Sequence, residues 1–99
     1  MTAPMRATII PSDQFCSVDG VGFHGVDMTS VAPEVHAMQW YGTHGEIEVQ
    51  DPLNGKVISN DIINSLDAFQ AVLDSYWEIR SAEESAAAQA EQENQVIEV

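Results

Sequence analysis

The stretch VHAMQWYGTHGEIEV, residues 35–49, contains two runs of alternating side chains on either side of a polar segment with a glycine at each end. Alternation with a period of two is typical of a strand that buries one face. GTHG, residues 42–45, supplies glycines for a tight connection between antiparallel strands. The stretch therefore predicts a β-hairpin, in which His36, Met38 and Trp40 share one face of the first strand.

Turn signals on both sides extend this sheet. Asn54-Gly55 predicts a turn into a third strand at KVIS, residues 56–59, so residues 36–59 form a predicted antiparallel meander. Upstream, RATIIP, residues 6–11, is rich in β-branched residues and ends on a proline, so it predicts a short first strand, and FCSV, residues 15–18, predicts a second. FHGVDMTS, residues 23–30, is compatible with a short strand or with an irregular loop.

The hydrophobic period changes near residue 65, where Ser65 is a candidate helix N-cap and Asp67 suits the positive end of the helix dipole. From there to about residue 80 the apolar residues recur at spacings of three and four. These residues are Leu66, Phe69, Val72, Leu73, Tyr76 and Trp77. We expect Phe69, Leu73 and at least one of Trp40 and Trp77 to join the helix to the sheet. The predicted fold class is α+β, a small antiparallel β-sheet region followed by one C-terminal amphipathic helix packed on it.

The C-terminal SAEESAAAQAEQENQVIEV, residues 81–99, is rich in alanine, glutamate and glutamine but has no apolar stripe to bury. We therefore expect residues 1–80 to form a single domain and residues 81–99 to be an acidic extension, helical or disordered. Val96 and Ile97 are apolar with nothing local to pack on. We expect them to dock on a partner or a second copy, and the extension to gain order in that assembly.

Sixteen acids against Arg6, Lys56 and Arg80 give a net charge of −13. That charge repels phosphate, which argues against nucleic acid or an anionic membrane as a partner. It is compatible with simple solubility, with a basic protein partner, or with an inhibitor that mimics nucleic acid. The single Cys16 allows no intrachain disulfide, and no apolar run has the length of a signal peptide or a membrane span. A cytoplasmic protein is expected.

Candidate chemical groups are scattered. His24, His36, His44 and Cys16 have no metal-ligand spacing, His36 is expected in or beside the core, and His44 in the turn. The glycines form no phosphate-binding loop, and the sequence has no nucleophile elbow. With sixteen acidic residues, a catalytic pair of carboxylates is an alternative that the sequence leaves standing. We expect no metal, no cofactor and no enzymatic activity, with exposed aromatic residues acting as contacts instead. The candidate contact residues are Trp40, Tyr41, Tyr76, Trp77, Val96 and Ile97.

Three segments carry a family resemblance: VHAMQWY, residues 35–41, GEIE, residues 45–48, and the helix that begins near FQAVLDSYW, residues 69–77. With the opening VDGVGFHGVD, residues 18–27, they resemble small proteins encoded near the tail and tail-fibre genes of tailed bacteriophages and prophages. The resemblance covers about residues 6–80. It implies a tail-fibre assembly chaperone or a minor virion tail component, with a tail-fibre or other tail protein, or a second copy of the chain, as partner. It implies no catalytic residues.

Overall fold

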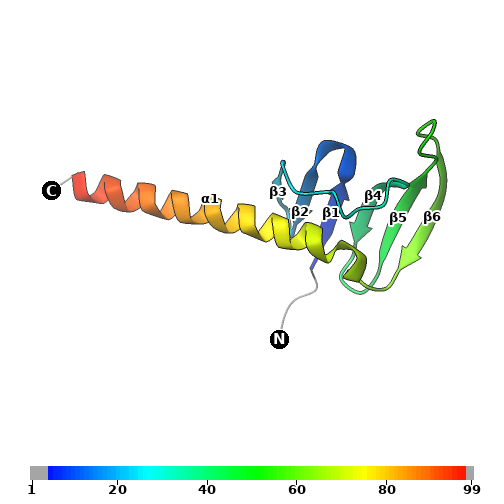
Figure 1. Cartoon of the computed structure of the whole chain (residues 1–99). Coiled ribbons are helices and arrows are strands. Elements are labelled where there is room, and N and C mark those ends of the chain that lie inside the picture. The colour runs from blue at the N-terminus through cyan, green and yellow to red at the C-terminus, as the bar shows by residue number, and fades with distance from the viewer. Residues whose placement is uncertain (1–4, 98–99) are drawn as a thin grey trace.

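The computed structural model of the chain describes residues 5–97, with side chains to residue 88 (Figure 1). Six strands come first: β1 (Ala7–Ile10), β2 (Phe15–Val18), β3 (Val21–Phe23), β4 (Val35–Trp40), β5 (Gly45–Gln50) and β6 (Val57–Ile63). A 3₁₀ turn, η1 (Pro11–Asp13), joins β1 to β2, and a second, η2 (Asp67–Phe69), leads into the helix α1 (Gln70–Ile97). The predicted α+β class, an antiparallel sheet followed by a packed C-terminal helix, is confirmed.

All six strands form one antiparallel sheet in the order β3-β2-β1-β4-β5-β6. The predicted meander is present as β4-β5-β6, and its last strand continues beyond residue 59 because β6 follows β5 along its whole length, as far as the pair Gly45–Ile63. Strand β1 joins this meander to the N-terminal strands by pairing Ile9 with Met38. Strands β3 and β6 are the two edges.

The hairpin between β4 and β5 is held by its own turn. The backbone N–H of Tyr41 donates to the carbonyl of His44 at 2.8 Å, and Gly42 adopts a φ of +103° that favours glycine. At Gly45 a Cβ would lie 2.6 Å from the carbonyl oxygen of Gln39, so a side chain there would displace the strand pair. The glycines of the opening stretch are therefore needed for folding.

One core lies between the sheet and the segments that cover one of its faces. Its buried residues are Ala7, Ile9, Cys16, Val18, Val26, Met38, Trp40, Phe69, Val72, Leu73 and Tyr76. Phe69, Leu73 and Trp40 are thus in the core as predicted. Trp77 is wrongly assigned to the apolar face, since 43 % of it is exposed. At 100° per residue it lies roughly 90° from the centre of the face that Phe69 and Tyr76 define.

The helix begins four residues after Leu66, the first apolar residue of its predicted pattern. The N-cap predicted at Ser65 is wrong, because the residue that precedes η2 is Leu66, which makes no side-chain cap hydrogen bond. Ser65 Oγ instead accepts the backbone N–H of Asp67 at 3.0 Å in the turn before η2, and the regular helix starts at Gln70. Beyond Arg80 the side chains to residue 88 are exposed, and α1 projects past the β3 side of the sheet (Figure 1). Of the two alternatives for the extension, the helix is observed as far as Ile97.

The segment between β3 and β4 crosses the same face of the sheet as α1 and completes the core (Figure 1). Of the stretch 23–30, whose sequence is compatible with a strand or a loop, only Phe23 belongs to β3, and the rest is an irregular loop. Val26 is fully buried, and its N–H donates to the carbonyl of Gln14 at 3.0 Å. The next N–H, of Asp27, donates to Ser75 Oγ of α1 at 3.0 Å. The loop is thereby fixed to both the sheet and the helix.

Candidate protein-binding surface

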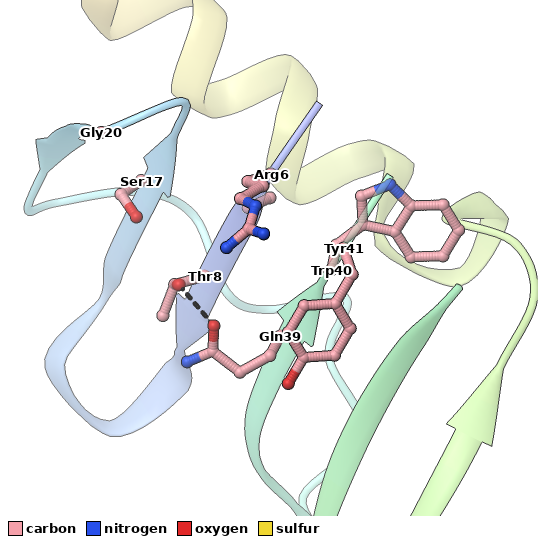
Figure 2. Close-up of a pocket in the computed structure, with 8 residues that line it drawn as sticks. Arg6, Thr8, Ser17, Gly20, Gln39, Trp40 and Tyr41 are labelled. Atoms are coloured by element: carbon pink, nitrogen blue, oxygen red, sulfur yellow. Dashed lines mark hydrogen bonds between the residues drawn. The ribbon is translucent and has the colours of Figure 1, made fainter. Parts of the chain in front are cut away.

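The face of the sheet turned away from α1 carries an open depression of about 230 Å³ (Figure 2). It lies over β1, β2 and β4, where α1 is seen behind the sheet. The residues that line it are Arg6, Ala7, Thr8, Ser17, Gly20, Gln39, Trp40 and Tyr41. We call this region the bare-face depression. It is too shallow to enclose a small molecule but is open to a protruding group of another protein.

The bare-face depression presents hydrogen-bond donors. Thr8 and Gln39 are register partners on β1 and β4, and Thr8 Oγ1 donates to Gln39 Oε1 at 2.8 Å. With its oxygen occupied in this way, the Gln39 amide has its two N–H donors left for other groups. The Arg6 guanidinium lies over the sheet near Gln39 (Figure 2). A cation and an amide on one surface suit carbonyl or carboxylate groups of a partner.

Tyr41 forms one rim of this depression, at the start of the β4–β5 turn (Figure 2). It is 39 % exposed, its hydroxyl donates to Glu46 Oε2 at 3.4 Å, and its ring centroid lies 5.5 Å from that of His44. The contact with Glu46 is long and weak, so it restrains the ring without burying it. Tyr41 therefore offers a partly ordered aromatic surface beside the Arg6 and Gln39 donors.

A second hollow adjoins the first and is acidic. It is lined by Ala37, Gln39, Glu46, Glu48 and Asn60. His36 Nε2 lies 3.5 Å from Glu48 Oε1. The prediction that His36 belongs in or beside the core is wrong: the β4–β5 register shifts between Val35 and Ala37, and this bulge turns His36 toward Glu48. The uncovered face thus carries two carboxylates in this hollow and the Arg6 cation in the bare-face depression.

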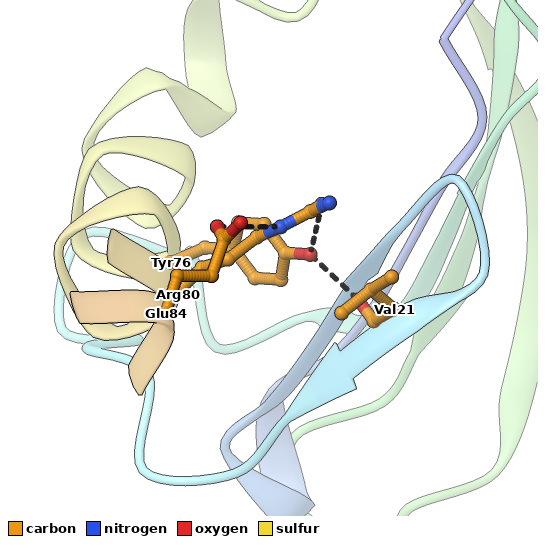
Figure 3. Close-up of polar contacts among 4 residues, drawn as sticks. All are labelled: Val21, Tyr76, Arg80 and Glu84. Carbon is orange, nitrogen blue, oxygen red and sulfur yellow. Dashed lines mark hydrogen bonds and ion pairs between the residues drawn. The ribbon is translucent and has the colours of Figure 1, made fainter. Parts of the chain in front are cut away.

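A further exposed aromatic lies on α1. The Arg80 guanidinium stacks on the Trp77 ring, 4.9 Å from its centroid, and Arg80 Nε lies 3.4 Å from Glu84 Oε1. Arg80 also donates through Nη1 to the Tyr76 hydroxyl at 3.1 Å (Figure 3), and this hydrogen bond raises the pKa of Arg80. Arg80 orients Trp77 on the helix surface.

The six predicted contact residues divide into three groups. Tyr41 and Trp77 are exposed. Trp40 and Tyr76 are not available to a partner in this fold, because they are 8 % and 0 % exposed and form part of the core. The side chains of Val96 and Ile97 fall outside the described part of the chain.

The histidines and the cysteine lie apart from one another. His24 packs on Phe15 with ring centroids 5.0 Å apart, and His44 lies in the turn, as predicted. Cys16 is fully buried on β2, and burial raises the pKa of its thiol to about 11. Within residues 5–88, whose side chains the structure describes, no group of three or more His, Cys, Asp or Glu side chains is placed to hold a metal ion. No helix among the described residues is long and apolar enough to cross a membrane.

Comparison with family models, with curated proteins and with solved structures gives no match to this chain. The surface must therefore be interpreted from its own chemistry. Sequence reasoning did not select Arg6, Thr8 or Gln39. Polar residues on the outer side of alternating strands were the available signal, but it does not say that β1 pairs with β4, which is what brings these three together.

Proposed function

We propose that the chain is a non-catalytic protein-binding module that recognises its partner through the bare-face depression and Tyr41. The partner that the family resemblance implies is a phage tail-fibre or other tail protein. The chain would act in the host cytoplasm as an assembly chaperone, or remain in the virion as a minor tail component.

The observation that carries this proposal is the placement of Tyr41 beside Arg6 and Gln39 on a face that neither α1 nor the loop covers. Tyrosine and arginine are the side chains most often found at the energetic centres of protein interfaces. A flat polar surface with a shallow hollow also suits a protein loop or turn better than a small metabolite, which needs an enclosing cavity.

The rival proposal is an acidic inhibitor that mimics nucleic acid. Such a mimic needs carboxylates in an unbroken array. Glu46 and Glu48 do lie in a row on β5, but the Arg6 cation lies on the same side of the sheet. The mixture of charges favours the first proposal. The two proposals differ in salt dependence. An interface in which carboxylates of this chain attract a basic partner weakens steeply as salt is added.

The test is capture of a co-expressed tail-fibre protein encoded beside this chain, by the wild type and by Tyr41→Ala and Arg6→Gln variants. Each should lower the affinity by about tenfold or more, as substitution of an interface centre does. Lys56→Gln is the control for Arg6→Gln, because it also removes one cation. Leu53→Ala is the control for Tyr41→Ala, because it also truncates an exposed side chain, 95 % exposed in the turn before β6. Both should bind as the wild type does.

Equal capture by Tyr41→Ala, Arg6→Gln and wild type would remove the bare-face depression from the interface. Capture that disappears when the salt concentration is raised would favour the charge mimic instead.

A further inference from the structure

The two edges of the sheet differ in how far they are protected. Strand β3 has only three residues, and the carbonyl of Val21 on it accepts the Tyr76 hydroxyl at 2.6 Å (Figure 3). Strand β6 has seven residues, of which six are exposed. An edge strand presents a row of backbone N–H and C=O groups that can pair with another strand. The β3 edge is short and partly occupied, and the β6 edge is open.

Strand β6 carries one feature that protects an edge, the bulge at Ile58, but it lacks the residue types that usually do so. It contains no proline and no lysine, and its one charged residue is Asp61. Val57, Ile58 and Ile62 are 52 %, 67 % and 59 % exposed. Three large apolar side chains are thus exposed on one open strand of a chain with net charge −13.

The sequence of β6, VISNDII, reads nearly the same in both directions as apolar, apolar, polar, polar, polar, apolar, apolar. We propose that β6 pairs antiparallel with β6 of a second copy, about a two-fold axis at Asn60. The β5–β6 register shifts between Val49 and Gln50 and leaves Ile58 as a bulged residue. With Ile58 bulged, the axis at Asn60 places Ile62 opposite Val57 at both ends. It also places Asp61 opposite Ser59, so that no acid faces its own copy.

Neighbouring registers place apolar residues opposite polar ones, or an acid opposite the same acid of the second copy. With Ile58 bulged, a two-fold axis at Ser59 places Val57 opposite Asn60, an apolar residue against a polar one. An axis at Asp61 places the two Asp61 carboxylates directly opposite each other, and like charges in that position destabilise a strand pair. Cross-strand apolar pairs, in contrast, are each favourable by some tenths of a kcal/mol to about 1 kcal/mol. The axis at Asn60 is therefore the one that the side chains select.

The geometry of the whole chain permits this pairing and stops it at two copies. A two-fold axis normal to the sheet puts both helices on the same face, and each α1 points away from its own β6 (Figure 1). The product is a continuous twelve-stranded sheet, from six strands in each copy. Its outer edges are the two short β3 strands, so the assembly closes as a dimer rather than growing into a fibre.

The dimer is expected to be weak, since edge pairing alone buries much less than the roughly 1,200 Å² of a stable interface. Sedimentation between about 10 µM and 1 mM should show the mass rising from one copy to two, in the affinity range of small transient interfaces. Because both copies are acidic, the dimer fraction should increase with salt, which screens their repulsion.

Ile62→Lys should abolish the dimer. Leu53→Lys adds the same charge in the turn before β6 and should leave the dimer intact.

Disulfide trapping tests the register. Cys16 is buried, so an introduced thiol is the reactive one. Adjacent pairs alternate between close and wide geometry, so at least one of two traps should give a covalent dimer under mild oxidation. The first trap is Asn60→Cys alone, and the second is Ser59→Cys mixed with Asp61→Cys. Ser59→Cys alone should form no covalent dimer.

A wild type that remains a monomer at about 1 mM, well above the dissociation constants of small transient interfaces, would overturn the proposal. So would a dimer that Ile62→Lys leaves intact, or one in which Ser59→Cys traps itself while Asn60→Cys and the mixture do not. None of these outcomes bears on the bare-face depression, whose variants are tested on a different partner.

Discussion

The hydroxyl of Tyr76 on α1 donates a 2.6 Å hydrogen bond to the backbone carbonyl of Val21 on β3, 55 residues earlier in the chain (Figure 3). The ring of Tyr76 is fully buried and packs edge-on against Phe23, 5.8 Å between centroids. One side chain thus fills the core between helix and sheet and satisfies a carbonyl at the sheet edge. The polar end of a tyrosine makes this possible where phenylalanine would only fill the space.

Tyr76→Phe should lower the free energy of unfolding by about 1–3 kcal/mol, the cost of leaving a partly buried acceptor unpaired. The ring packing on Phe23 is retained, so the effect reports the hydroxyl. Tyr41→Phe is the control, because it removes only the 3.4 Å exposed contact with Glu46. Denaturant unfolding measures both. Equal stability of the two variants would mean that the Val21 carbonyl is satisfied by water once the hydroxyl is gone.

Leu73→Ala should cost about 2–5 kcal/mol, since it removes a 5 % exposed side chain from the centre of the helix–sheet contact. His44→Ala, in the exposed turn, should cost little by comparison. Thermal or denaturant unfolding of the pair is the measurement. If His44→Ala unfolded the protein and Leu73→Ala did not, the assignment of the core would be wrong.

The Cys16 thiol should react slowly with alkylating reagents, because burial raises its pKa to about 11 from 9.0 and little thiolate forms at neutral pH. The folded state prefers the protonated thiol. Its contribution to stability is therefore complete below pH 9 and is lost as the pH rises from 9 toward 11. Alkylation rates in native buffer and in denaturant measure the first effect. A native rate equal to that of the unfolded chain would contradict the burial of Cys16.

Truncation after Ala88 should leave the melting temperature nearly unchanged, because the last core side chain of α1, Tyr76, and the Arg80–Glu84 pair both lie within the retained helix. An exposed ion pair such as this contributes at most about 1 kcal/mol, so even truncation after Arg80 should cost little. Calorimetry of the full chain and both truncations is the test. Failure of the shorter forms to fold would place residues 81–99 in the domain rather than in an extension.

The same truncations test whether the extension contributes to association. Our prediction that Val96 and Ile97 dock on a partner requires truncated protein to capture a co-expressed fibre protein less well than full-length protein does. Equal capture would remove the extension from the mechanism. Dimerisation through β6 should be unaffected, since α1 points away from that edge (Figure 1).

The sequence by itself determined the local elements of this protein. Alternation in VHAMQWY and GEIEVQ predicted β4 and β5, Asn54-Gly55 predicted the turn before β6, and the apolar spacing from Phe69 to Tyr76 predicted the buried face of α1. These features depend on side chains within a few residues of one another, which is the range over which strand and helix periods act.

Only the tertiary structure decided which faces and edges are open. The pairing of Thr8 with Gln39 is non-local, the bulge that turns His36 outward depends on the β5 register, and Tyr76 rather than Trp77 is buried because of where α1 crosses β2 and β3. A periodic pattern states that one face of each element is buried, but not which neighbour covers it. Contacts between distant parts of the chain determine which neighbour covers each element. They therefore leave the bare-face depression and the β6 edge uncovered.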